Sequence, residues 1–311
     1  HGFAKDEKHA AELSAVAGMD MEMASETYEL HLKALLDEGK FTVKQLDEFV
    51  KNILRIKYRL GLFENPYKPA DHNGNLYAKT HLQAAKVAAI KSTVLLKNEN
   101  VLPIGETSKV AIIGPLANAP LDQLGTWSID GEKEHTVTPV KAFTNGNVKF
   151  QFAEGLAYSR DKSKKGFKEA LQLAKDSDII LFFGGEEAIL SGEAHSRANI
   201  DLPGAQEELI KELKKTGKPL VLIILAGRPI SITNIIDDVN AVLMAWHPGT
   251  MGGEALYEII YGMHEPGGRL PVSWPKTAGQ LPFFYNHKNT GRPANNLDYV
   301  AIDEIPVGSY Q

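Results

Sequence analysis

The sequence of 311 residues contains no cysteine. Disulfide bonds, thiolate metal sites and cysteine nucleophiles are therefore excluded, whereas this absence fits cytoplasm and periplasm alike. Long apolar runs are lacking too. The longest, LVLIILA at Leu220–Ala226, is far shorter than the ~20 residues that span a bilayer. We therefore expect no membrane-spanning helix.

An excess of positive charge is also missing, since the net charge is -5 at neutral pH. Such a chain lacks the electrostatic footprint of proteins that bind nucleic acid or anionic membranes. Phosphate loops, the nucleophile elbow of α/β-hydrolases, the His-Glu-x-x-His zinc motif and glycosylation sequons are absent from the sequence. With 43% apolar and 23% charged residues, the composition is that of a globular protein with a sizeable core.

Residues 25–67 show helical periodicity. Thr42 followed by Gln45 is a capping-box signature, apolar residues recur at helical spacing from Leu46 to Ile53, and Gly61 is placed to end the helix. The apolar face of this amphipathic helix needs a partner, and almost nothing precedes it. We therefore expect a neighbour that the sequence does not contain.

Four almost continuously apolar runs follow a polar, turn-rich connector at Lys68–Ala78, where we place a domain boundary. Such runs are typical of parallel strands that are buried on both faces. Amphipathic helices are predicted between them. The alternation predicts an α/β fold with an open, mostly parallel sheet and helices on both faces. The runs lie at residues 109–114, 178–185, 219–227 and 241–249, and the helices at 167–174 and 202–217.

Ligands of open parallel sheets collect beyond the carboxyl ends of the strands. Three loops at such positions carry glycines with polar or aromatic side chains, and we expect them to converge at one edge: Leu121–Glu132, Glu186–Arg197 and Trp246–Ala255. In the second loop, Glu193 is a candidate general acid/base on a glycine-flexible segment with neighbouring carboxylates. The alternative is a solvated carboxylate paired with Arg197.

Other residues of these loops leave two interpretations open. Trp127 is either a platform that stacks on a sugar ring or a loop tryptophan that covers the core. His195 and His247 are better explained as hydrogen-bonding loop histidines than as metal ligands, because no second ligand stands at a suitable spacing. The glycine turn GTMGGEAL, residues 249–256, is better explained by tight strand-to-helix packing than by phosphate binding.

Seven segments together resemble glycoside hydrolase family 3, and most closely its bacterial periplasmic β-glucosidase branch. The resemblance runs from about Gly2 to Pro293. The segments are AGMDMEM, VKNILRIKYRLGLFENPY, STVLLKNENVLPI, KVAIIGPLA, LPGAQEELIKELKKTGKPLVLIILAGRPI, WHPGTMGGEAL and GRLPVSWPKTAGQLPFFYNHKNTGRP.

The resemblance implies a particular domain organisation. Members of the family pair a (β/α)8-type barrel with an α/β sandwich, and the active site lies between the two. Residues 1–66 are then the last helices of a truncated barrel, 67–90 a linker and entry helix, 91–290 the sandwich, and 291–311 a tail leading towards an absent third domain. The family's aspartate nucleophile, on a Ser-Asp-Trp-like motif, is missing from the sequence and is expected upstream of His1.

The resemblance also implies roles for single residues. Glu193 matches the family's acid/base glutamate, and Trp127 matches the aromatic residue that stacks on the aglycone-side sugar. Arg197, on the same loop as Glu193, is predicted to contact the substrate. Glu186 and Glu187 match a strand-end motif and are expected to shape the local electrostatic field. Neither a metal nor a cofactor is implied.

We therefore expect a fragment of a retaining, exo-acting β-glycosidase that is inactive without its barrel domain. The alternatives are a non-catalytic glycan-binding α/β module and a nucleotide-binding α/β protein. The partners implied are a glycoside or oligosaccharide and the barrel of the same polypeptide, and the location implied is the periplasm or the outside of the cell. A chain that begins at His1 is compatible with a removed signal peptide. Glucose, xylose and N-acetylglucosamine remain open as the terminal sugar, the last being disfavoured.

Overall fold

The computed structural model describes residues 2–67, 76–282, 286, 301–302 and 305–306. The chain divides into two units, His1–Leu76 and Tyr77–Gln311, and each is described by itself. The division falls inside the predicted connector, most of which lies outside the described residues. No described helix is both long enough and apolar enough to cross a membrane.

The first unit is helical. Its helices are α1 (Glu7–Val16), α2 (Thr27–Asp37) and α3 (Val43–Arg59). The prediction of helix in this region is confirmed for α2 and α3, whereas α1 was not foreseen. The predicted capping box is present, because the Thr42 hydroxyl accepts from the backbone N–H of Gln45 while the Gln45 side chain accepts from the N–H of Thr42.

The core of the first unit is small. Ala11, Leu35 and Phe41 are buried together. On α3, Phe49 is buried but Val50 remains 47% exposed. The predicted need of the amphipathic helix for a partner is therefore not met by the described residues of this unit.

The second unit is built on a six-stranded sheet with the order β1-β6-β5-β4-β2-β3. Only β1 runs antiparallel to its neighbour, and the other pairings are parallel. The four predicted strands are confirmed as β2, β4, β5 and β6, while β1 and β3 were missed. The strands are β1 (Val94–Asn98), β2 (Val110–Ile113), β3 (Phe150–Ala153), β4 (Ile179–Gly185), β5 (Leu220–Leu225) and β6 (Ala241–Trp246).

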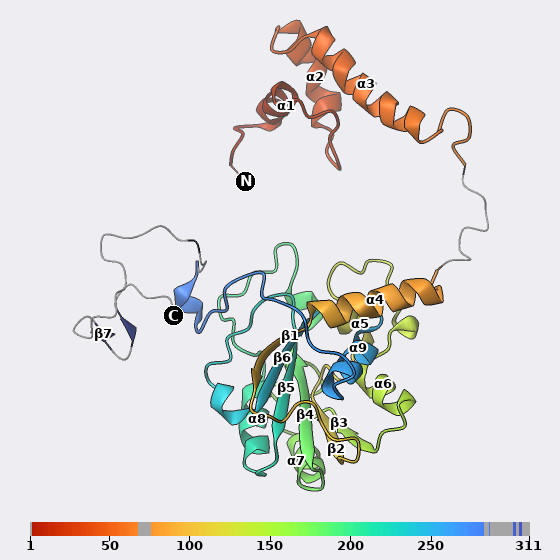
Figure 1. The fold of residues 1–311 in the computed structure, drawn as a ribbon. Coiled ribbons are helices and arrows are strands. Elements are labelled where there is room, and N and C mark those ends of the chain that lie inside the picture. Colours follow the sequence, from red (N-terminus) through yellow and green to blue (C-terminus); the bar gives the residue numbers. More distant parts are fainter. Residues whose placement is uncertain (1, 68–75, 283–285, 287–300, 303–304, 307–311) are drawn as a thin grey trace. The chain divides into compact units, whose positions relative to one another are not determined.

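Helices cover both faces of this sheet (Figure 1). One face packs on α7 and α8, and the other packs on α4, α6 and α9. The helices are α4 (Lys79–Ser92), α5 (Pro120–Leu124), α6 (Pro139–Asn145), α7 (Phe167–Lys175), α8 (Gln206–Lys214) and α9 (Gly252–Ile260). Short 3-10 turns lie at Lys133–His135, Ala188–Leu190, Ile236–Asp238 and Ala278–Gln280. The fold is thus the predicted α/β sandwich.

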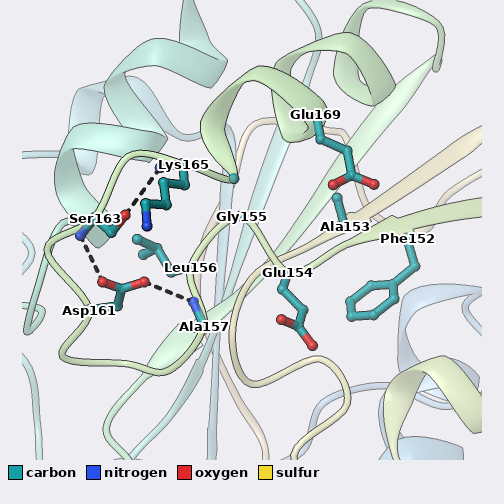
Figure 2. Close-up of a pocket in the computed structure, with 11 residues that line it drawn as sticks. Phe152, Ala153, Glu154, Gly155, Leu156, Ala157, Asp161, Ser163, Lys165 and Glu169 are labelled. Carbon is teal, nitrogen blue, oxygen red and sulfur yellow. Dashed lines mark hydrogen bonds between the residues drawn. The ribbon is translucent and has the colours of Figure 1, made fainter.

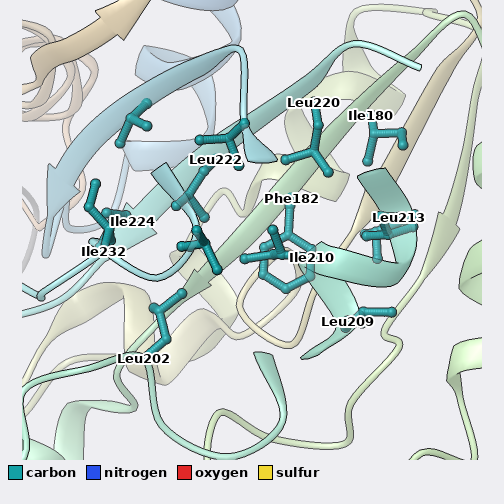
Figure 3. Close-up of a cluster of buried hydrophobic side chains, with 14 of the residues drawn as sticks. Ile180, Phe182, Leu202, Leu209, Ile210, Leu213, Leu220, Leu222, Ile224 and Ile232 are labelled. Carbon is teal, nitrogen blue, oxygen red and sulfur yellow. The ribbon is translucent and has the colours of Figure 1, made fainter. Parts of the chain in front are cut away.

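The strands bury alternate side chains in two separate cores. Phe182 and Leu222 point to the layer of α7 and α8, where Leu209 meets them (Figure 3). Phe183 and Ile223 belong to the opposite core. This period of two, with both faces covered, explains why the central strands are continuously apolar.

The order of the strands places a switch point between β2 and β4. The chain leaves β2 towards β3 on one side, and it leaves β4 towards β5 on the other. Crevices at such points are the usual ligand sites of open α/β sheets. In this structure the loops that carry Trp127 and Glu193 follow β2 and β4, the two strands at the switch point. The predicted tail at 291–311 lies mostly outside the described residues, among which β7 (Ala301–Ile302) pairs with β8 (Ile305–Pro306).

Candidate functional site

The three strand-end loops converge at the carboxyl edge of the sheet, as expected. The carboxylate of Asp122, in the short helix α5 of the segment after β2, accepts from the backbone N–H of Ala188 at 2.9 Å. The Thr126 hydroxyl contacts the carbonyl of Ser191 at 2.8 Å. Ser191 Oγ lies 3.3 Å from His247 Nε2, which follows β6. These contacts join the loops after β2, β4 and β6.

Glu193 stands at the exposed apex of the loop after β4. Within the described part of the chain, its carboxylate has no hydrogen-bond or ion-pair partner. The turn around it uses left-handed backbone, with φ of 110° at Gly192 and 61° at Ala194. A Cβ at Gly192 would lie 2.5 Å from Thr126 Cγ2, so glycine is needed there for close packing as well as for conformation. The carboxylate is therefore presented to solvent by a tightly packed turn.

The base of this loop is held by a buried carboxylate. Glu186 is 0% exposed and is paired with the guanidinium groups of Arg197 and Arg228. Arg228 also donates to the carbonyl of His195 at 2.9 Å, and Arg197 donates to the carbonyl of Asp201 at 3.0 Å. Two guanidinium groups thus compensate one buried charge and bind the backbone of the loop.

The alternative to an acid/base role for Glu193 was an ion pair with Arg197. This ion pair is not formed, because Arg197 is paired with Glu186. That side chain is only 17% exposed. Its predicted contact with substrate stays a prediction.

Glu187 is compensated as well. Its carboxylate accepts from Arg160 Nε at 2.9 Å and from the Ser159 hydroxyl at 2.7 Å. The Arg160 guanidinium is the main cause that lowers the pKa of Glu187, and Ser159 contributes in the same direction. Because both strand-end carboxylates have guanidinium partners, the structure gives little support to the expectation that their charges shape the field at Glu193.

Trp127 is 68% exposed in the loop after α5, and Ile129 beside it is 88% exposed. A tryptophan that covered the core would be buried, so this geometry favours the stacking interpretation. Gly125 precedes this pair with φ of 89°, and a Cβ there would lie 2.8 Å from the His247 ring. The ring of Trp127 therefore stands out from a loop whose start is packed against the loop after β6.

The two histidines make hydrogen bonds within the loops. His195 Nδ1 lies 3.1 Å from the carbonyl of Ser191. Burial lowers the pKa of His247, which favours its neutral form. No group of three His, Cys, Asp or Glu side chains among the residues that the structure describes is arranged to hold a metal ion.

The glycine turn after β6 fits the packing interpretation. A Cβ at Gly252 would lie 2.5 Å from Pro248 Cγ, and one at Gly253 would lie 2.3 Å from backbone atoms of Thr138. Both glycines are therefore needed for the close approach of α9 to its neighbours. These packing contacts explain both glycines without a bound phosphate.

A separate cavity of about 420 Å³ lies beyond β3 (Figure 2). Its polar wall includes Asp161, whose carboxylate accepts from the N–H of Ala157 at 3.1 Å and from that of Ser163 at 2.7 Å. These backbone bonds lower the pKa of Asp161. The carboxylate therefore organises a turn, and neither Glu193 nor Trp127 lines this cavity.

Comparison with known proteins identifies the family. Residues 93–304 match the model of the glycosyl hydrolase family 3 C-terminal domain. The chain belongs to glycosyl hydrolase family 3. It is 36% identical to a periplasmic beta-glucosidase of Salmonella typhimurium over 95% of this chain and 42% of that protein. It is 33% identical to a beta-xylosidase of Formosa agariphila over 99% of this chain and 45% of that protein.

Solved structures of the family share the fold. The crystal structure of a beta-glucosidase from Listeria innocua in complex with glucose superposes with a TM-score of 0.89 at 33% identity, covering 98% of this chain and 43% of that one. The chain thus spans less than half the length of these family 3 relatives.

Several residues that shape this candidate site were not predicted from the sequence. Arg228 follows β5 at the same edge as Glu186, so the strand-end rule together with the demand of a buried carboxylate for a cation would have indicated it. Thr126, Ser191 and Asp122 carry no comparable signal. Their roles depend on contacts between loops far apart in the sequence.

Proposed function

We propose that this chain supplies the acid/base half of a retaining, exo-acting β-glycosidase. The observation that carries the proposal is the carboxylate of Glu193, exposed at the apex of an anchored loop and unpaired among the described residues, at the same edge of the sheet as the exposed ring of Trp127. Family membership and relatives named as beta-glucosidases and a beta-xylosidase support it.

In this reaction a carboxylate attacks the anomeric carbon while a second carboxyl group protonates the departing oxygen. Glu193 is assigned the second role, and it then removes a proton from the water that hydrolyses the glycosyl intermediate. The two carboxyl groups of a retaining enzyme stand ~5–5.5 Å apart. No partner carboxylate contacts Glu193 in the described structure, so the nucleophile is assigned to a barrel domain of the same polypeptide.

Trp127 is assigned the aglycone side. A flat apolar ring favours the apolar face of a sugar, and its large exposed area is lost from water when the sugar binds. Arg197 remains a candidate for a direct contact, although its guanidinium is already bound by Glu186. The proposal places the leaving group between Trp127 and Glu193.

The test is Glu193→Gln in the complete enzyme that contains the barrel. With a poorly leaving alkyl or disaccharide aglycone, kcat/KM is expected to fall ~10²–10⁴-fold, since that is the usual contribution of general acid catalysis. With an activated nitrophenyl aglycone, glycosylation needs no acid and the loss is expected to be much smaller.

Glu154→Gln is the matched control, because Glu154 is an exposed carboxylate just after β3, a strand of the same sheet. It is expected to act as the wild type on both substrates. Equal, small effects of Glu193→Gln on good and poor leaving groups would overturn the assignment. For the chain of 311 residues alone, no hydrolysis of an aryl β-glucoside is expected.

A glycan-binding module without catalysis is the second candidate, and the exposure of Trp127 favours it. The glycan affinity of such a module is expected to be unchanged by Glu193→Gln and to fall on Trp127→Ala.

We also propose export from the cytoplasm, supported by the Salmonella relative that is named periplasmic. Glucose and xylose both remain candidate terminal sugars, in line with the names of the relatives.

A further inference from the structure

The Thr126 hydroxyl sits at the junction of two loops. It contacts the carbonyl oxygens of Ala188 and Ser191 and lies 3.0 Å from Ser191 Oγ. Thr126 directly precedes Trp127, and Ser191 stands two residues before Glu193. One side chain therefore joins the loop of the stacking ring to the loop of the candidate acid.

The direction of these hydrogen bonds follows from the chemistry of their atoms. Carbonyl oxygens only accept, so the single hydroxyl proton of Thr126 points to Ala188 or Ser191. Thr126 Oγ1 is then the acceptor in its contact with the Ser191 hydroxyl. Ser191 Oγ also lies 3.3 Å from His247 Nε2, where the tautomer of the ring sets which atom donates.

The same junction is closely packed. Ser191 is 6% exposed. A Cβ at Gly227, in the loop after β5, would lie 2.5 Å from Ser191 Oγ and 3.1 Å from His247 Nε2. Rotation of the hydroxyl groups away from this arrangement would leave buried polar atoms unpaired.

We propose that His247, Ser191 and Thr126 form a hydrogen-bonded clasp that fixes the Glu193 loop against the Trp127 loop. The inference rests on the proposed function, because it assigns the distance between acid and stacking ring to this clasp. The three residues are positioning residues, since they act through Glu193 and Trp127. Loss of one hydroxyl group frees both loops together and leaves the sheet unchanged.

The first test measures hydrogen–deuterium exchange in the 311-residue chain. Thr126→Val and Ser191→Ala each remove one hydroxyl group with little change of shape. Amides of both segments, 125–130 and 188–197, are expected to exchange about 2- to 10-fold faster, the range for one lost hydrogen bond. Amides of β4 and β5 are expected to keep the wild-type rate.

Two further variants serve as controls for this exchange experiment. Thr126→Ser retains the hydroxyl group and is expected to restore slow exchange. Ser196→Ala removes an exposed hydroxyl of the same loop and is expected to change nothing. Faster exchange in one segment only, in neither, or equally throughout the sheet would overturn the clasp.

The second test uses the complete enzyme. Thr126→Val is expected to lower kcat/KM about 10-fold on a poor leaving group, for which the acid must be well placed, and to change it little on an activated one. Thr126→Ser is expected to rescue the loss, and equal losses on both substrates would contradict the positioning role. If Glu193→Gln proves silent, the proposed function fails, whereas the coupling of the two loops is still decided by the exchange rates.

Discussion

The loop between β4 and α8 contains two regions that differ in almost every physical property. At its base, the carboxylate of Glu186 is fully buried and bound by two guanidinium groups. At its apex, the carboxylate of Glu193 is exposed and has no partner among the described residues. Only seven positions separate the two glutamates in the sequence.

This difference teaches that the loop divides its tasks by position. The buried charge pairs fix the backbone, since an uncompensated charge in that environment would be costly. The apex carries a carboxylate that no bond from the described residues restrains, which suits the role proposed for it. Changes at the base are therefore expected to act on stability, and changes at the apex on activity alone.

The largest expected effect on stability is that of Glu186→Gln. This change removes the buried charge and leaves Arg197 and Arg228 without their shared partner. The expected loss in the free energy of unfolding is about 3 kcal/mol, at the lower end of the usual cost because both guanidinium groups still reach solvent. Urea unfolding of the chain, followed by circular dichroism, measures it.

Glu193→Gln is the matched comparison at the apex. Its free energy of unfolding is expected to stay within about 0.5 kcal/mol of the wild type, as for other exposed positions without contacts. A loss below about 1 kcal/mol for Glu186→Gln would contradict the proposed difference between base and apex.

Gly227→Ala tests how tightly the loops after β4, β5 and β6 are packed against one another. The added methyl group would lie 2.8 Å from Ser191 Cβ, and the expected destabilisation is about 1–3 kcal/mol, the usual range for overpacking. Gly267→Ala is the control, because a Cβ there has no atom within 4 Å. Equal thermal midpoints of the two variants would show that the junction yields easily.

Trp127→Ala addresses a second exposed side chain at the apex of its own loop. Since the ring is 68% exposed, its removal is expected to change the free energy of unfolding by no more than about 0.5 kcal/mol. Affinity of the complete enzyme for a disaccharide is expected to fall about 2- to 12-fold, the equivalent of a lost aromatic contact. Calorimetry in the Glu193→Gln background, in which hydrolysis of the disaccharide is expected to be slow, measures it, and an unchanged affinity would remove Trp127 from the site.

The central sheet was predictable because β2, β4, β5 and β6 are buried on both faces, which leaves almost no polar residue in their sequences. The edge strands β1 and β3 are only partly buried, with one fully buried residue each. Four or five residues with this pattern resemble loops as much as strands. The strands that were not predicted are thus the two edge strands, in which exposure to solvent allows polar residues.

The site was predictable to a similar degree. The rule that ligands gather at the carboxyl ends of parallel strands located the three loops. The contacts between them were not predictable, because Thr126 and Ser191 are 65 positions apart. Their meeting depends on the turns at Gly125 and Gly192, where close packing of the backbone selects glycine.

A small effect that depends on pH is expected at Asp122, a residue of α5 whose carboxylate bonds the loop after β4. Burial is the main cause that raises the pKa of its carboxyl group above the ordinary value of 3.8, against the opposing bond from the N–H of Ala188. The folded state then holds this proton more tightly than the unfolded state. Stability of the wild type is accordingly lowered by this group as pH rises through 3.8 and the folded pKa.

Asp122→Asn keeps an oxygen that can accept from Ala188 and removes the titration. The free energy of unfolding of the variant, minus that of the wild type, is therefore expected to increase from about pH 3.8 upwards and to level off near neutrality. The total change is expected to stay below about 1 kcal/mol, because the carboxyl group is only half-buried. Urea unfolding at pH 3.5, 5 and 7 measures this difference. A decrease with rising pH would mean that the ionised carboxylate stabilises the junction, which would make Asp122 a charged anchor of the loop base like Glu186.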